Sequence, residues 1–466
     1  MTSVSQAVTA VQRQQFGEIE SNMQALFQQK AECLAQATGF VQRHSKITGS
    51  AFAQTLVFGF LNQPEARYTD LQQILALQGV QASPQALEER MTPQAASFMR
   101  YLLEETVSMA IRSQECTIPT LHTFAGVYLQ DGTIVTLPDA LQEQWRGSGY
   151  AGGQSGLRVQ LRINWMDGKI SGPWLQDARA SENTGEASIK HTDVPKGALY
   201  VTDSGYLIIK RMRELDAQGV FWLAPAKANL LITDEQGIKR DLPSFVACQP
   251  EGVIDRWVFV GAEKLWCRLL VFPADNTRRS QQSKYDQKIR VKGSRHDVQV
   301  GRHKTAKGKK GRKSSQETPQ HRRLKGAVVL LSNAPVTCLS AKQARVVMRV
   351  RWQIELIWKV WKQYGKVDVW RSEKSTRILC EVYAKLIAMI LQHWFTIVGC
   401  WSDPHRSLVK ASRLIQKGAP CIMLTMHGPL TQQALFQLLC LGMKGCTMNS
   451  RKKHPNTSQH LLTASG

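Results

Sequence analysis

The chain of 466 residues lacks the features of a secreted protein and of a membrane protein. Its ten cysteines include no Cys-x-x-Cys pair and are too sparse for a disulfide scaffold, so we expect reduced thiols. Residues 1–15 are polar and rich in glutamine, without the basic start and apolar core of a secretory signal. The most apolar stretch, residues 382–401, carries Lys385, Gln392 and His393, which favours a buried helix over a membrane span. We therefore expect a cytoplasmic protein that does not interact with a membrane.

Acidic residues are also scarce, because 36 Asp and Glu stand against 60 Lys and Arg and leave a net charge of +24. Such a protein is drawn to a polyanion, with nucleic acid as the first candidate, although solubility alone can also explain a basic surface. Residues 278–325 hold 17 basic residues against three acidic ones, which is more than half of the net charge. We expect this segment either to hold phosphates or to be a solvated linker without a role, and in neither case to read a base sequence.

The remaining composition, 43% hydrophobic and 21% charged, is that of a globular protein with several domains. Residues 1–115 have the spacing of apolar residues that is typical of helices. Ser83-Pro84 and Thr92-Pro93 each predict a helix start, and Gly79 predicts the end of the preceding helix. Residues 70–90 therefore form either a helix-turn-helix for DNA or part of a helical bundle.

From about residue 118 the sequence changes to short β runs, with Asp167-Gly168 as a strong hairpin turn. Three antiparallel strands are followed by a fourth strand, a helix and a fifth strand, which is the order of an RNase H-like core. The strands are expected at residues 123–130, 157–164, 170–175, 199–202 and 220–224, and the helix at residues 206–215.

We therefore expect an α+β fold in which an RNase H-like catalytic core is interrupted by a β-rich insertion and flanked by helical regions. The expected parts are a helical N-terminal DNA-binding domain (1–115), the first part of the core (116–227), the insertion with its basic segment (228–334), the second part of the core (335–400) and a helical C-terminal region (401–466).

A long helix is predicted to begin at Ser340 and to reach about residue 366. At about 100° per residue, Glu355 lies about 40° from Arg351 and about 20° from Lys362, so the three side chains share one face. The simpler explanation is a helix stabilised by an Arg351–Glu355 pair. Interleaved tryptophans and the basic character of the chain favour a second interpretation, in which the carboxylate binds a cation and the two bases bind phosphates.

The sequence around this helix, with Arg351, Glu355 and Lys362, resembles the Tyr-Arg-Glu-Lys signature of DDE transposases of the type-four family of bacterial insertion sequences. The preceding segment Leu331-Ser332-Asn333-Ala334-Pro335 fits the same resemblance. The Tyr position of the signature is Met348 here, which removes a phenol that contacts backbone phosphate in the family.

The resemblance implies two further aspartates on core strands, and both positions are occupied. Asp131, in Asp-Gly-Thr, is expected at the end of the first strand, and Asp203, in Asp-Ser-Gly-Tyr, at the end of the fourth. Asp139 and Asp193 compete for the two positions, but Asp139 follows Pro138 beyond the strand. An isolated Asp-Gly or Asp-Ser-Gly sequence usually just forms a turn, so the shared order of the motifs carries the assignment.

The resemblance implies that Asp131, Asp203 and Glu355 hold two Mg²⁺ ions, which Mn²⁺ can replace, while Arg351, Lys362 and Met348 lie along the DNA phosphates. Cys440 and Cys446 have a poor spacing for a zinc site. The expected partners are the transposon ends, the target DNA and a second copy of the chain in a synaptic homodimer. The expected reaction is hydrolysis of DNA followed by joining of the 3′-OH ends to the target. The alternatives are a transposase-derived DNA-binding protein without cleavage activity and an unrelated Mg²⁺ nuclease.

Overall fold

The computed structural model describes residues 9–115, 118–149, 153–181, 193–227, 229–274, 324, 326–403, 405–428, 431–448 and 457–464. The chain divides into two compact units, the first comprising Met1–Lys190 and Arg349–Gly466 and the second His191–Met348. Apart from Leu324, residues 275–325 lie outside the described residues, and with them most of the basic segment.

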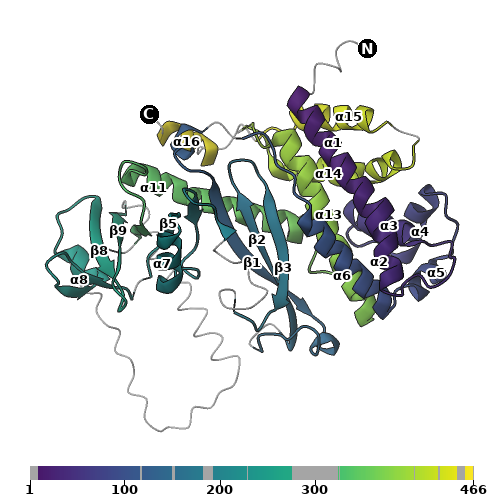
Figure 1. Cartoon of the computed structure of the whole chain (residues 1–466), viewed down its shortest axis with the longest axis horizontal. Coiled ribbons are helices and arrows are strands. Elements are labelled where there is room, and N and C mark those ends of the chain that lie inside the picture. The colour runs from purple at the N-terminus through teal and green to yellow at the C-terminus, as the bar shows by residue number, and fades with distance from the viewer. Residues whose placement is uncertain are drawn as a thin grey trace, which may run out of the picture. The chain divides into compact units, whose positions relative to one another are not determined.

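The first unit begins with helices that fit the expected helical N-terminal region (Figure 1). Thr48, Ser83 and Thr92 cap three of them by accepting a backbone N–H three residues later, as the sequence predicts for the last two. Gly79, with φ of +78°, follows the end of α4, which confirms the predicted helix end. The helices are α1 (Ala10–Gln24), the π-helix η2 (Ala25–Lys30), α2 (Ala31–Ala37), α3 (Gly49–Asn62), α4 (Tyr68–Leu77), α5 (Pro84–Glu89) and α6 (Pro93–Ser108).

Residues 70–90 do form helix, turn and helix, but α5 has only six residues. Helix α4 packs against α3, and α3 and α6 both pack against α13 (Ser375–Cys400). Helix α4 also contacts α5, so the segment is packed onto the other N-terminal helices, and both the helix-turn-helix and the helical bundle remain open. Binding of DNA by this region remains a prediction.

Helix α13 is the centre of the first unit (Figure 1). Among the described residues it is the one helix long and apolar enough to cross a membrane, but its apolar window is completely buried inside the protein. Helices α1, α3, α6, α14 (Leu408–Thr425) and α15 (Gln432–Lys444) all contact it. The interpretation of residues 382–401 as a buried helix is confirmed. The last helix of the unit, α16 (Thr457–Ala464), contacts the 3₁₀ turn η3 (Pro119–Leu121).

The first unit also contains an antiparallel sheet of β1 (Val127–Leu137), β2 (Ser155–Asn164) and β3 (Ile170–Asp177). The predicted Asp167-Gly168 hairpin joins β2 to β3, and Gly168 adopts φ of +72°. Strand β1 starts later than expected and runs seven residues further, because it stays paired with β2 from Tyr128 to Leu137. The Asp-Gly at 131–132 is therefore part of a strand and not a turn.

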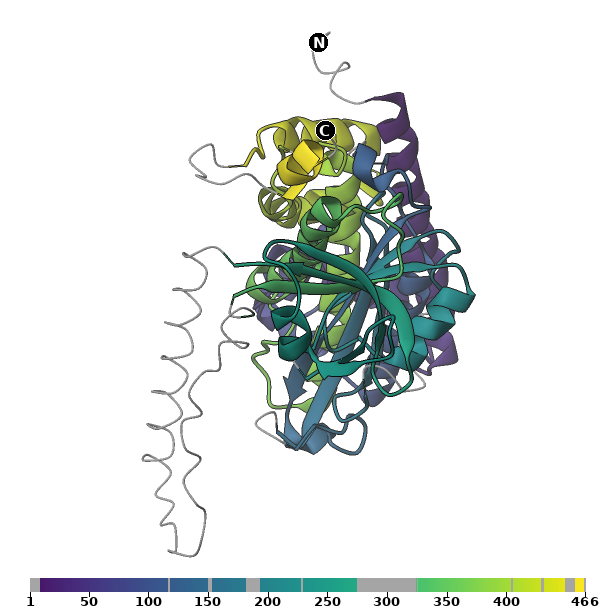
Figure 2. The ribbon, with the colours of Figure 1, turned by 90° about the vertical axis from the view of Figure 1, so that its left-hand side faces the viewer.

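The second unit is built on strands in the order β4-β5-β10-β9-β8-β6-β7, whose twist is visible in Figure 2. Strands β4 and β5 are parallel and are connected by helix α7, whereas β10 is antiparallel to both β5 and β9. The elements are β4 (Leu199–Val201), α7 (Ile209–Ala217), β5 (Phe221–Pro225), β6 (Leu231–Thr233), β7 (Lys239–Asp241), α8 (Leu242–Ala247), β8 (Ile254–Val260), β9 (Leu265–Phe272), β10 (Val328–Ser332) and α11 (Ala341–Val347).

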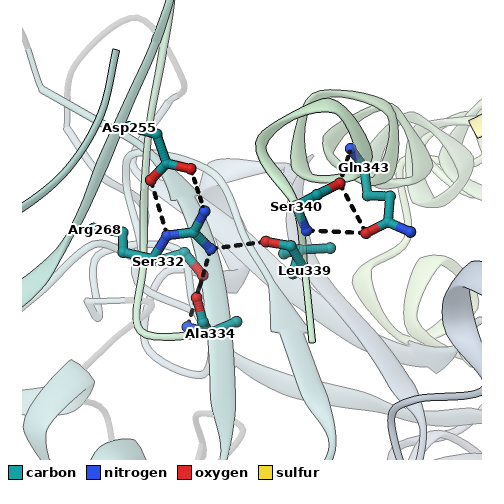
Figure 3. Close-up of polar contacts among 7 residues, drawn as sticks. All are labelled: Asp255, Arg268, Ser332, Ala334, Leu339, Ser340 and Gln343. Carbon is teal, nitrogen blue, oxygen red and sulfur yellow. Dashed lines mark hydrogen bonds and ion pairs between the residues drawn. The ribbon is translucent and has the colours of Figure 1, made fainter. Parts of the chain in front are cut away.

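A buried arginine fixes the connection from β10 to α11 (Figure 3). Arg268 of β9 is 1% exposed and makes a bidentate pair with Asp255 of β8 at 3.0 and 2.5 Å. Its Nη1 donates to the carbonyl oxygens of Ala334 and Leu339, both at 2.7 Å. Directly afterwards Ser340 caps α11 in a capping box with Gln343, as the sequence predicts for Ser340. One guanidinium thus joins the β8–β9 hairpin to the start of this helix.

We predict that Arg268→Met lowers the free energy of unfolding by about 2–5 kcal/mol, because it leaves two carbonyls without a donor and Asp255 without its cation. Arg240→Met is the matched control, because Arg240 pairs with Asp234 in the same unit but its side chain is 29% exposed, against 1% for Arg268. That change is expected to cost about 1 kcal/mol or less. Urea unfolding of both variants measures the difference, and equal losses would contradict the role of Arg268.

His393 of α13 gives the first unit a pH-dependent stability. Its Nε2 lies 2.8 Å from the carbonyl oxygen of Gly168, and burial lowers its pKa to about 4. The unfolded chain therefore binds a proton near pH 6.5, whereas the folded protein does not until about pH 4. As the pH falls through this window, protonation favours the unfolded state by up to about 1.4 kcal/mol per pH unit.

We predict that His393→Gln reduces the fall in unfolding free energy between pH 6.5 and 4.5, because glutamine can donate to Gly168 without titrating. The exposed His44, changed to Gln, is the control and should leave the pH profile unchanged. Urea unfolding across this pH range measures both. Parallel profiles for the wild type and His393→Gln would show that His393 is not responsible.

Candidate active site

The helix predicted to carry the site consists of three kinds of turn in succession. After α11 the chain forms the 3₁₀ turn η6 (Met348–Arg351), then α12 (Trp352–Lys359), then the π-helix η7 (Val360–Tyr364). The step of about 100° per residue assumed above therefore applies to α11 and α12 but not to η6 and η7. The predicted long helix after Ser340 is confirmed, because the chain is helical without a break from Ala341 to Tyr364, but its turns are not all α-helical and Lys362 lies in the π turn.

Arg351 and Glu355 form an ion pair on the first turn of α12. Arg351 Nη2 lies 2.7 Å from Glu355 Oε1, and the two side chains are 25% and 31% exposed. The pairing is the one expected from their spacing of four residues. It shows that Glu355 reaches the surface next to a guanidinium, where a phosphate or a cation could approach.

Lys362 points toward the strand that carries Asp131. Its Nζ donates to the carbonyl oxygen of Ile134 in β1 at 3.2 Å and lies 3.8 Å from Asp368 Oδ2. Helix α12 also contacts β1. Both α12, which carries Glu355, and Lys362 of η7 therefore contact β1, the strand of Asp131, within one unit.

Asp131 lies within β1, opposite Leu161 of β2, and not at the end of a strand as expected. Its side chain is half-buried, and Oδ1 accepts a hydrogen bond from the N–H of Gly132 at 2.9 Å. The competing Asp139 is in the 3₁₀ turn η4 (Asp139–Leu141), where Oδ1 accepts from the N–H of Gln154. Asp139 therefore has a structural role in a turn beyond β1.

Asp203 lies two residues after β4, at the carboxyl end of a parallel strand, close to the predicted position. Its Oδ1 accepts the N–H groups of Gly205 at 2.8 Å and of Tyr206 at 3.1 Å, which fixes the turn before α7. Carboxyl ends of parallel strands are common positions for binding sites. Asp203 belongs to the second unit, whereas Asp131 and Glu355 belong to the first.

The donor set of the three predicted ligands suits magnesium, because carboxylate oxygens are the ligands that hard divalent cations prefer. Within the described ranges, however, no group of three or more His, Cys, Asp or Glu side chains is placed so that it could hold a metal ion. The nine described cysteines are all free, and the pair Cys440 and Cys446 is buried.

Met348 and the tryptophans complete the predicted site. Met348 is half-buried in η6, where the boundary between the units falls directly after it. Trp358 and Trp361 are buried and in edge contact with each other, so they belong to the core. Trp352, in contrast, is 58% exposed three residues before Glu355.

The sequence reasoning missed residues that hold this helix in place. Asp368 lies near Lys362, and Lys385 of α13 donates to the carbonyls of Lys366 and Val369 just beyond η7. A signal for Lys385 was present, because Arg377, Glu381 and Lys385 recur every four residues in an otherwise apolar helix.

Comparison with known proteins shows which family the chain belongs to. A family model described as a transposase DDE domain matches residues 122–391, more than half of the chain. The chain belongs to the transposase DDE domain family. Every predicted site residue of this family member lies within the matched region.

Related proteins of the family are transposases of insertion sequences. The transposase for insertion sequence element IS231B of Bacillus thuringiensis subsp. berliner is 25% identical over 370 residues, covering 77% of this chain and 75% of the relative. The transposase for IS231D of Bacillus thuringiensis subsp. finitimus is 26% identical over 385 residues, with the same coverage. The transposase for IS1151 of Clostridium perfringens is 24% identical over 388 residues, covering 77% of this chain and 76% of the relative.

A solved structure is also similar, namely the cryo-EM structure of a piggyBac transposase synaptic complex with hairpin DNA. The TM-score is 0.42 at 9% identity, with 94% of this chain and 87% of that chain covered.

Proposed function

We propose that the protein is an active transposase that binds the ends of its insertion sequence, cleaves DNA by metal-dependent hydrolysis and joins the 3′-OH ends to target DNA. The family match over residues 122–391 is the observation that carries the proposal. The packing of the Glu355 helix against the strand of Asp131 supports it, because the two motifs are far apart in the sequence.

In this proposal Asp131, Asp203 and Glu355 hold two Mg²⁺ ions, or Mn²⁺ in their place. When bound, such ions help to activate the attacking oxygen and to stabilise the leaving one. The residues of the chain provide three negative charges for this purpose on β1, after β4 and on α12.

Arg351 and Lys362 bind backbone phosphates in this proposal. The guanidinium of Arg351 can exchange one oxygen of Glu355 for a phosphate oxygen, because it presents several N–H donors in a planar fork. Lys362 provides a point charge from the π turn beside β1. Met348 lines the same phosphate path without the hydrogen bond that a tyrosine would donate.

The order of elements supports an RNase H-like core. Strands β1, β2 and β3 are consecutive and antiparallel, and β4, α7 and β5 follow as a parallel crossover unit. We propose further that residues 1–115 bind DNA, that two copies act together in a synaptic complex, and that the protein works in the cytoplasm. The basic segment 278–325 supplies charge for the phosphates of DNA in this proposal.

We predict that Glu355→Gln lowers cleavage of end DNA in Mg²⁺ by about 10³-fold or more, because loss of a metal ligand removes several kcal/mol of transition-state stabilisation. The measurement is the appearance of 3′-OH ends and joined products from DNA carrying the ends that flank the gene of this protein. Glu373→Gln, at an exposed position of the same unit, is the control and should cleave like the wild type.

The outcomes of this experiment separate the alternatives. A wild type that binds the ends but never nicks them would identify a DNA-binding protein without cleavage activity. Nicking without joining would identify a nuclease. Equal activity of the wild type and Glu355→Gln would remove Glu355 from the site.

We predict that Met348→Tyr retains cleavage activity and strengthens binding of end DNA by up to about tenfold, because a phenol can donate a charge-assisted hydrogen bond to a phosphate. Met348→Phe is the matched control, since it adds the ring without the hydroxyl. Binding titrations and cleavage rates of both variants measure the effect. A clear loss of activity in Met348→Tyr but not in Met348→Phe would contradict the alignment of this position with the signature tyrosine.

A further inference from the structure

Helix α13 carries three charged residues that are almost completely removed from water. The side chains of Arg377, Glu381 and Lys385 are 4%, 2% and 1% exposed, and their spacing of four residues places them on one face of the helix. Lys385 Nζ lies 2.8 Å from Glu381 Oε1, and Arg377 Nε lies 3.6 Å from Glu381 Oε2. Burying three charges is costly, and a well-packed apolar residue would often serve stability equally well. Because stability alone does not require these charges, the groups that each one contacts indicate its role.

The contacts of Lys385 lead to the end of the Glu355 helix. Besides Glu381, its ammonium donates to the carbonyl oxygens of Lys366 at 3.1 Å and of Val369 at 2.7 Å. These three acceptors use all three protons of the ammonium group. Lys366 has φ of +44°, so the chain leaves the helical path there, and its carbonyl oxygen accepts the N–H of Val369 at 3.1 Å. Lys385 adds a second, charged donor to this carbonyl from α13.

A second contact lies one turn further along α13. A Cβ atom on Gly365 would come within 2.4 Å of Met389 Sδ and 2.8 Å of the carbonyl oxygen of Trp361. The end of η7 thus packs directly on the Met389 side chain of α13, and a larger residue at 365 would displace that side chain and crowd the Trp361 carbonyl. Lys385 and Met389, four residues apart, hold the same end of η7 by a charge and by packing.

The segment held in this way determines where Lys362 points. Lys362 lies three residues before Gly365, and Asp368, 3.8 Å from its Nζ, lies between the two residues whose carbonyls Lys385 binds. On the other side, Nζ reaches the carbonyl of Ile134 in β1. A shift of residues 365–369 would move both the backbone of η7 and Asp368 relative to β1.

We propose that Lys385 is a positioning residue for Lys362, acting through the carbonyls of Lys366 and Val369. The inference rests on the proposed function in so far as Lys362 binds phosphate. Lys385 itself does not contact DNA in this proposal, because its side chain is buried.

The same network also connects residues 366–385 with the N-terminal helices. Arg377 donates to the carbonyl of Ala66 and lies 3.8 Å from the centre of the Tyr68 ring, while Lys366 pairs with Glu65. Residues 366–385 are therefore held against the connection between α3 and α4 and against the first residue of α4.

The test compares Lys385→Met with the matched control Lys374→Met in the full chain. Lys385→Met leaves the Arg377–Glu381 pair electrically neutral, which favours folding of the variant. Lys374 is 66% exposed and pairs with Glu88 on the surface, so the control loses the same charge without touching the carbonyls. If Lys385→Met does not fold by circular dichroism, Lys385→Gln replaces it, because the shorter amide cannot bind both carbonyls.

Hydrogen–deuterium exchange without DNA gives the first readout. We expect the amides of residues 360–369 to exchange at least about tenfold faster in Lys385→Met than in the wild type, with Lys374→Met unchanged. Unchanged exchange in Lys385→Met would overturn the proposal. This arm does not depend on cleavage, so it tests whether Lys385 anchors residues 360–369 even if the wild type proves inactive and the proposed function fails.

Cleavage of end DNA at saturating concentration gives the second readout. Lys362→Ala is expected to lower the rate by about 10²-fold in the wild type, but by less than about tenfold in the Lys385→Met background. Such coupling follows only if both residues act on the same contact. Additive losses would show that Lys385 contributes to stability alone and would overturn the proposal.

Discussion

Burial of α13 on all sides is the constraint on which the first unit depends. A helix of 26 residues spans about 39 Å, and it can be covered only by elements from distant parts of the sequence. Helices α1, α3 and α6 precede the sheet in the chain, and α14 and α15 follow α13, yet all five contact it. The helical N-terminal region therefore shares its core with the segment that follows the Glu355 helix.

The polar residues of α13 make this helix a junction as well as a core. Each needs a partner because it is buried, and many of these partners are backbone carbonyls of other elements. Gln392 donates to Ser412 in α14, His393 contacts Gly168 of the β2–β3 turn, and Lys385 donates to the residues after η7. The hydrogen bonds offset the free-energy cost of burying these polar groups, and they attach the β2–β3 hairpin, α14 and the end of η7 to α13.

The sequence predicted what depends on local chemistry. The caps at Ser83, Thr92 and Ser340, the helix end at Gly79 and the Asp167-Gly168 turn all use short-range hydrogen bonds or a backbone conformation that favours glycine. The position of Asp131 within β1 was not predictable in this way, because pairing with β2 through Leu137 outweighs the turn preference of Asp-Gly. The π turn at Val360–Tyr364 could not be predicted from the sequence either, because the spacing of apolar residues does not distinguish i+4 from i+5 backbone hydrogen bonds.

That change of helix type affects how the signature itself should be interpreted. Met348 and Arg351 are three residues apart within a 3₁₀ turn, where side chains at this spacing eclipse one another. Arg351 and Glu355 are four apart at the start of α12 and form an ion pair, as an α-helix allows. Glu355 and Lys362 are seven apart across the change from α to π, and Lys362 still reaches β1. Each spacing of the signature thus falls on a different kind of helical turn, and the position of Lys362 depends on the π turn and on the contacts that hold its end.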